Sequence, residues 1–151
     1  MIGRPFFAMD TAEIQAAIPH RPPMLLVDRV TEITDDQIVA EKTFRDDEYF
    51  FQGHYPDYPL VPGVILCECA AQAGAILLSK QTQAAGGVPV LTRLNDARFK
   101  QMVRPGDTIR SEVKIDEVVS KAFYLTAKVT CNDKMVVRFS FACTVAESEQ
   151  K

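Results

Sequence analysis

The chain has two histidines, His20 and His54, so it offers few candidates for a base that titrates near neutral pH. His54 is the stronger candidate, because it stands in a loop restrained by three prolines, directly before a long apolar segment. Rigid loops beside a core commonly hold catalytic groups. A histidine in such a loop can also serve only to hydrogen-bond the loop to itself, and this alternative stays open.

Glu68 lies within the apolar segment, among Leu66, Cys67, Cys69 and Ala70. Burial disfavours an unpaired carboxylate, so the neutral, protonated form is expected there. A protonated carboxyl is the form that a general acid needs. The alternative is that Glu68 points into a crevice and pairs with a surface arginine.

Three further residues complete a candidate site. Gln72 follows Glu68 by one helical turn, so its amide can hydrogen-bond the carboxyl and orient it. Gly63 and Val64 begin the helix, where free backbone N–H groups and the helix dipole can hold an oxyanion. A base, a neutral acid and an oxyanion site suit proton removal beside a carbonyl with loss of a β-oxygen substituent. This chemistry requires no metal or other cofactor.

The residues around the candidate site predict one α+β domain over residues 1–151, with an antiparallel sheet. Asp10 and Glu13 form a capping box for a short helix that Pro19 ends. The helix after Pro62 is predicted to run to Lys80 and to be buried, because it is apolar on nearly every face. A transmembrane span is the rejected alternative, since Glu68, Gln72 and Gly74 interrupt it. The predicted strands are Met24 to Ile33, Gln37 to Phe44, Pro89 to Leu94, Ala97 to Val103, Thr108 to Val119, Phe123 to Cys131 and Met135 to Val145.

Charge and composition limit the classes of partner that the protein is expected to bind. The net charge is −3, without a long basic run, which argues against nucleic acid or an anionic membrane as the main partner. The first ten residues lack the apolar core of a signal peptide, and the four cysteines match no zinc-binding spacing, so we expect a cytoplasmic protein with reduced cysteines. A sheet covered on one face with free edges also predicts a dimer.

The segment GHYPDYPLVPGVILCECAAQ, residues 53–72, resembles the signature of the 3-hydroxyacyl-[acyl-carrier-protein] dehydratases of fatty-acid synthesis, the FabZ family. It has the histidine, the spaced prolines, Pro-Gly at the helix start, a glutamate fourteen residues after the histidine, and a glutamine four residues later. The similarity extends to IPHRPPMLLVDRV, residues 18–30, and ARFKQMVRPGD, residues 97–107. It implies a hot-dog fold, a curled antiparallel sheet around one long central helix, in a homodimer that often assembles into trimers of dimers.

The resemblance also implies roles for the candidate residues. His54 would take the C2 proton of a (3R)-hydroxyacyl thioester, while Glu68 of the other subunit would protonate the departing hydroxyl, leaving a trans-2-enoyl thioester. The N–H of Gly63 would polarise the thioester carbonyl. The implied partner is an acidic acyl carrier protein, so we expect a basic docking patch. Its candidate residues are Arg93, Arg98, Lys100 and Arg104.

Two details of the sequence refine this expectation. The related FabA-type dehydratase/isomerases carry Asp where this chain has Glu68, so dehydration without isomerisation is expected. Members commonly have aromatic residues and an Ile-Asp pair before the ARF motif, whereas this chain has Val90, Leu91, Thr92 and Arg93. Acyl-chain length therefore stays open. The competing functions are a hot-dog acyl thioesterase and a non-catalytic acyl-binding paralogue.

Overall fold

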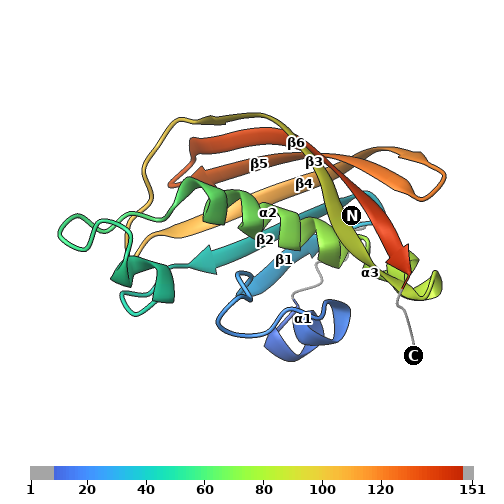
Figure 1. Cartoon of the computed structure of the whole chain (residues 1–151), viewed down its shortest axis with the longest axis horizontal. Helices are drawn as coiled ribbons and strands as arrows, with labels where there is room; N and C mark the ends of the chain where they lie inside the picture. Colours follow the sequence, from blue (N-terminus) through green and yellow to red (C-terminus); the bar gives the residue numbers. More distant parts are fainter. Residues whose placement is uncertain (1–8, 148–151) are drawn as a thin grey trace, which may run out of the picture.

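The computed structural model describes residues 9–147, which form one six-stranded antiparallel sheet and three α-helices (Figure 1). The strand order across the sheet is β1-β2-β4-β5-β6-β3, so β1 and β3 are the two edges. The strands are β1 (Arg29–Ile33), β2 (Gln37–Thr43), β3 (Gly87–Phe99), β4 (Thr108–Val119), β5 (Ala122–Cys131) and β6 (Lys134–Glu147). The predicted α+β class with an antiparallel sheet is confirmed.

The longest helix, α2 (Gly63–Leu77), lies across the curled face of this sheet (Figure 1). Its Ala70 and Ala73 are fully buried, and Phe141 of β6 and Leu125 of β5 pack near Gly74. Ten of its fifteen residues are buried, so the predicted central helix is confirmed. Among the described residues, no helix has both the length and the apolar character needed to cross a membrane.

Two short helices flank α2. The α1 helix (Thr11–Ala17) begins with the predicted capping box, in which Glu13 N–H donates to Asp10 Oδ1 at 2.9 Å. The central helix ends at Leu77, earlier than the predicted Lys80, and α3 (Ser79–Ala84) follows after Leu78. The apolar run therefore covers two helices, because the chain must turn at the end of the sheet before it enters β3.

Three predicted strands need correction. The first begins at Arg29, not Met24, because backbone groups at Met24 and Leu26 bind the Gln72 side chain in place of a neighbouring strand. The stretches Pro89 to Leu94 and Ala97 to Val103 are one continuous strand, β3, interrupted by a bulge at Asp96, where φ is 57°. Beyond Phe99 the chain leaves the sheet, and Val103 O accepts from Val61 N–H just before α2.

Candidate active site

The loop between β2 and α2 fixes the orientation of His54. A 3-10 helix, η1 (Tyr49–Gln52), precedes it, and Tyr55 turns the chain with φ of 55°. The Nδ1 atom of His54 lies 3.0 Å from the carbonyl oxygen of Leu60. Because a carbonyl oxygen only accepts hydrogen bonds, Nδ1 must carry a hydrogen, which leaves the lone pair of the neutral ring on Nε2. This is the arrangement of a general base.

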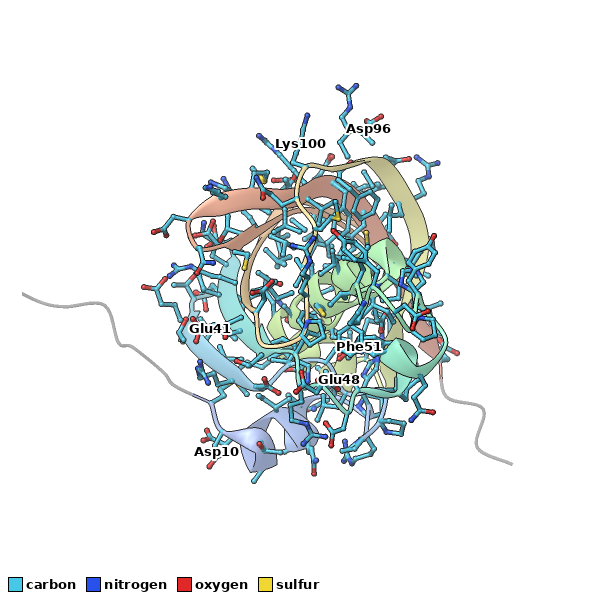
Figure 2. The ribbon with its side chains drawn as sticks, turned by 90° about the vertical axis from the view of Figure 1, so that its left-hand side faces the viewer. Asp10, Glu41, Glu48, Phe51, Asp96 and Lys100 are labelled. Atoms are coloured by element: carbon cyan, nitrogen blue, oxygen red, sulfur yellow. The ribbon has the colours of Figure 1, made fainter. Side chains whose placement is uncertain are left out.

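Buried contacts hold this loop on the sheet. Lys42 of β2 lies 2.9 Å from Glu48, and both side chains are 9% exposed. Glu48 also accepts a hydrogen bond from the Arg45 N–H at 3.1 Å. The rings of Phe50 and Phe51 pack into the core, and their centroids are 4.9 Å apart. Figure 2 shows Glu48 and Phe51 on the same side of the molecule. The segment that carries His54 is therefore anchored by charge and by apolar packing.

The first turn of α2 presents unpaired backbone donors. Within residues 9–147, the N–H groups of Gly63 and Val64 have no acceptor, and the Val64 side chain is 75% exposed. A Cβ on Gly63 would lie 2.8 Å from Cε1 of Phe99. The glycine thus lets the Phe99 ring lie directly against the start of α2, a packing contact that sequence reasoning missed. The predicted oxyanion site remains open to a ligand atom.

Glu68 and Gln72 make the contact that their spacing predicts. Nε2 of Gln72 donates to Oε2 of Glu68 at 2.8 Å and to the Met24 carbonyl at 2.8 Å, while its Oε1 accepts from Leu26 N–H at 2.7 Å. The Glu68 side chain is 28% exposed, so it is less buried than its apolar neighbours suggested. It contacts no arginine within the described residues, and its neighbours are an amide and a histidine.

That histidine is His20, which sequence reasoning set aside as a base. Its Nε2 lies 3.9 Å from Oε2 of Glu68, and its Nδ1 is buried without a hydrogen-bond partner among residues 9–147. The only sequence signal for it was its place in the IPHRPPMLLVDRV segment. His20 and Glu68 are 48 positions apart in the sequence, so the regular spacing of residues within one helix does not predict their contact.

A pocket of about 260 Å³ lies in front of Glu68. Polar side chains from His20, Glu68 and Gln72 line one part of it, and the remainder is apolar. Its apolar lining comes from Ala71, Ala75, Pro89, Val90, Leu91 and Cys143. The unusual Val90-Leu91 pair therefore forms an apolar wall of the pocket beside the candidate acid.

His54 does not line this pocket, and no contact joins it to Glu68 within the described part of the chain. His54 lies in the loop before the N-terminus of α2, whereas Glu68 lies in the second turn of the helix and lines a pocket with residues of β3. Within one protomer, the candidate base and the candidate acid therefore make no contact.

The four predicted docking residues do not line one common concavity, and Lys100 lines two, one with Arg98 and one with Arg104. Arg98 and Lys100 line a concavity of about 460 Å³ together with Arg138, which lies directly opposite Arg98 in the sheet. Figure 2 shows Lys100 projecting from the edge of the molecule remote from Asp10. Like charges in opposed strand positions are unfavourable, and Lys128 lies on the other side of Arg138. Arg138 and Lys128 were not predicted.

Arg104 and Arg93 lie outside this concavity. The Arg104 guanidinium lies 5.2 Å from the centre of the Tyr58 ring and donates to the Tyr58 hydroxyl at 2.5 Å. Arg93 is exposed on β3. The described residues contain no cluster of three or more histidine, cysteine or carboxylate side chains arranged to hold a metal ion.

Comparison with known sequences gives a consistent family. The model of the FabA-like domain matches residues 18–140. The 3-hydroxyacyl-[acyl-carrier-protein] dehydratase FabZ of Clostridium perfringens is 44% identical over 127 residues, which cover 84% of this chain and 91% of the relative. The FabZ of Caulobacter vibrioides is 41% identical over 146 residues, covering 95% and 92%.

Solved structures share the fold at lower identity. The dehydratase heterocomplex ApeI:P from Xenorhabdus doucetiae matches with a TM-score of 0.77 and 16% identity, covering 89% of this chain and 91% of that one. A hypothetical thioesterase with coenzyme A from Streptococcus pneumoniae matches with a TM-score of 0.61 and 11% identity, covering 80% and 87%. The predicted hot-dog fold is confirmed.

Proposed function

Because this chain belongs to the FabZ family of FabA-like 3-hydroxyacyl-[acyl-carrier-protein] dehydratases, we propose that it dehydrates a (3R)-hydroxyacyl thioester to the trans-2-enoyl thioester with its own His54 and Glu68. The observation that carries the assignment of residues is the bond from His54 Nδ1 to the Leu60 carbonyl, which leaves Nε2 free as a base. The reaction is that of a hydro-lyase in fatty-acid synthesis.

In the proposed reaction, Nε2 of His54 removes the C2 proton, and the C2–H electron pair forms the new C2=C3 bond. Glu68 donates its proton to the C3 hydroxyl, and the C–O bond breaks with its electron pair on oxygen, which leaves as water. Charge develops on the thioester oxygen, where the free N–H groups of Gly63 and Val64 can stabilise it. Gln72 orients the acid through its hydrogen bond to Oε2.

The site is proposed to lie between two copies of the chain. Within one protomer His54 and Glu68 do not meet, and the edge strand β3 exposes Val88, Val90, Leu91 and Leu94. An uncovered apolar edge strand favours pairing with another strand. Pairing of β3 with its copy in a homodimer would carry the Glu68 pocket wall to the interface; trimers of such dimers are the expected larger assembly.

The activity is tested with purified protein and 3-hydroxyacyl thioesters, by following enoyl product and free thiol in parallel. We expect enoyl product from the wild type and a loss of at least about 100-fold in His54→Ala and Glu68→Gln, the range typical of lost acid–base catalysis. Free thiol without enoyl product would instead select a thioesterase. If neither product forms from short or long acyl chains, the remaining function is that of a non-catalytic acyl-binding protein.

The shared site is tested by mixing two inactive variants. Subunits of His54→Ala and Glu68→Gln are exchanged after mild denaturation, and exchange is verified with tagged chains. A mixed dimer would contain one intact site, so part of the activity should return. A mixture that exchanges fully and stays inactive would rule out the shared site.

We further propose that the thioester is presented by an acyl carrier protein in the cytoplasm, docked on the concavity that Arg98, Lys100 and Arg138 line. An acidic carrier would relieve the repulsion between the opposed arginines. Charge reversal at Arg98 and Lys100 should raise KM for carrier-linked substrates several-fold more than for coenzyme A substrates. Lys80→Glu on α3 is the matched control; equal effects on both substrates would exclude this docking surface.

A further inference from the structure

The two carboxyl oxygens of Glu68 have different surroundings. Oε2 accepts the hydrogen bond from Gln72 at 2.8 Å and faces Nε2 of His20 at 3.9 Å. Oε1 accepts no hydrogen bond from residues 9–147. Two nitrogens therefore converge on one oxygen, while the other is left to face a ligand.

The environment of the second ring nitrogen selects the tautomer of His20. Its Nδ1 is buried and has no partner among the described residues. A hydrogen on Nδ1 would have no acceptor there, whereas a hydrogen on Nε2 leaves only a lone pair unsatisfied at Nδ1. The second arrangement costs less, because a buried N–H without an acceptor is more unfavourable than a buried lone pair without a donor. The Nε2–H of His20 thus faces Glu68.

Two anchors hold His20 in this place. The Arg21 guanidinium donates to the carbonyls of Gln15 at 2.9 Å, Ile18 at 2.9 Å and His20 at 2.7 Å, which fixes the chain as it leaves α1. The Gln72 amide holds the Met24 carbonyl and the Leu26 N–H on the other side. The same Gln72 side chain binds Glu68, so the acid and the His20 segment share one support.

We propose that His20 is a positioning residue for the acid step, which stabilises the charge that develops on Glu68 as its proton leaves. This inference rests on the proposed function. As Oε1–H gives its proton to the C3 hydroxyl and water departs, negative charge spreads to Oε2. The His20 Nε2–H then closes from 3.9 Å to hydrogen-bond distance. A contact that strengthens only as charge develops lowers the barrier without tightening substrate binding.

The first test compares His20→Phe with His20→Gln. Phenylalanine keeps a flat ring without a donor, whereas the glutamine amide supplies an N–H at the position of Nε2. We expect His20→Phe to lower kcat about tenfold with KM nearly unchanged, the effect of losing one hydrogen bond to a developing charge. His20→Gln should recover most of kcat. Loss of kcat in both variants to the same extent, with native circular dichroism, would overturn the inference.

The second test changes the leaving group. A 3-chloroacyl thioester loses chloride, which departs with its bonding pair and needs no proton from an acid, while the C2 proton still goes to His54. We expect His20→Phe and Glu68→Gln to eliminate chloride at nearly the wild-type rate and His54→Ala to be inactive. An equal loss in His20→Phe on both substrates would indicate a merely structural role and exclude the inference.

The two proposals fail in different ways. A wild type that forms no enoyl product from any 3-hydroxyacyl thioester would overturn the proposed function and the role of His20 together. A wild type that forms enoyl product, with His20→Phe matching it in kcat on the hydroxyacyl substrate, would overturn the role of His20 alone.

Discussion

At the scale of single residues, the polar partners of His54 and Glu68 suit them to opposite proton transfers. The Leu60 carbonyl holds a hydrogen on Nδ1 of His54, which leaves Nε2 able to accept a proton. The Gln72 amide supports Oε2 of Glu68, which leaves Oε1 able to give one. Each assignment rests on one hydrogen bond in which the partner group can act in only one way: the Leu60 carbonyl accepts and the Gln72 NH2 group donates.

Gln72 is 1% exposed and uses its amide for three hydrogen bonds, so Gln72→Leu should damage both stability and activity. The variant leaves the Leu26 N–H and the Met24 carbonyl without their hydrogen-bond partner, which should lower the free energy of unfolding by about 2–4 kcal/mol. Urea denaturation measures this loss. The exposed Gln81 of α3 offers the matched control, Gln81→Leu, which should change stability little. Equal effects at both positions would contradict the role of the buried amide.

The cysteine thiols should resist alkylation in the folded protein. Burial raises the pKa of Cys143 to about 11, and burial also raises the pKa of Cys69 far above its ordinary value. At pH 8, three pH units below that pKa, about one thousandth of Cys143 is the reactive thiolate. Iodoacetamide should therefore label Cys143 only slowly until the protein is unfolded, as mass spectrometry of the modified peptides would show. Cys131, which is half-buried, is the internal reference and should react first.

At the scale of elements, α2 links every part of the proposed site. Its first turn supplies the free N–H groups, its second carries Glu68, and its third carries Gln72. The sheet can approach this helix closely only where side chains are small. Gly74 allows the Phe141 ring to pack against the helix, since a Cβ there would lie 2.9 Å from Cζ.

Gly74→Ala should therefore destabilise the protein although alanine favours helix. The gain in helix propensity is about 1 kcal/mol, but Phe141 is fully buried, and overpacking a core costs about 1–3 kcal/mol. Chemical denaturation should show a net loss, and Gly74→Ala with Phe141→Leu should recover part of it. Gly53→Ala is the control, because nothing lies within 4 Å of its added Cβ. A more stable Gly74→Ala would contradict this packing argument.

At the scale of the whole molecule, β3 is the edge strand that a single chain leaves uncovered beside the proposed site. It borders the Glu68 pocket through Pro89, Val90 and Leu91, yet most of its residues are exposed. The opposite edge strand, β1, is shorter, and Met9 covers it in part by forming a bridge with its Val30. Of the two edge strands in the described sheet, β3 alone combines length, apolar exposure and contact with the candidate site.

A charge on β3 should dissociate the proposed dimer and abolish activity together. Leu94→Lys places an ammonium group on the exposed edge, where pairing with a second copy would bury it at a cost of several kcal/mol. Sedimentation velocity should show monomers, with dehydration lost. Val119→Lys, which charges another exposed apolar position at the end of β4, should leave both assembly and activity intact. An active monomer of Leu94→Lys would exclude a site between subunits.

The sequence by itself predicted the antiparallel sheet, the buried helix, the capping box at Asp10 and the spacing of Glu68 and Gln72. These features depend on residues close together in the chain, where periodicity and caps act directly. It misplaced the start of β1 and divided β3, because the partners of Met24 and the bulge at Asp96 come from distant segments.

Only the tertiary structure brought His20 to Glu68, placed the Phe99 ring against Gly63 and set Arg138 opposite Arg98. Each contact joins segments at least 36 positions apart. Such contacts depend on how the sheet curls around α2, and no local pattern encodes that geometry. The candidate base and acid could therefore be predicted from the sequence, whereas the residues that contact and support them depend on tertiary packing.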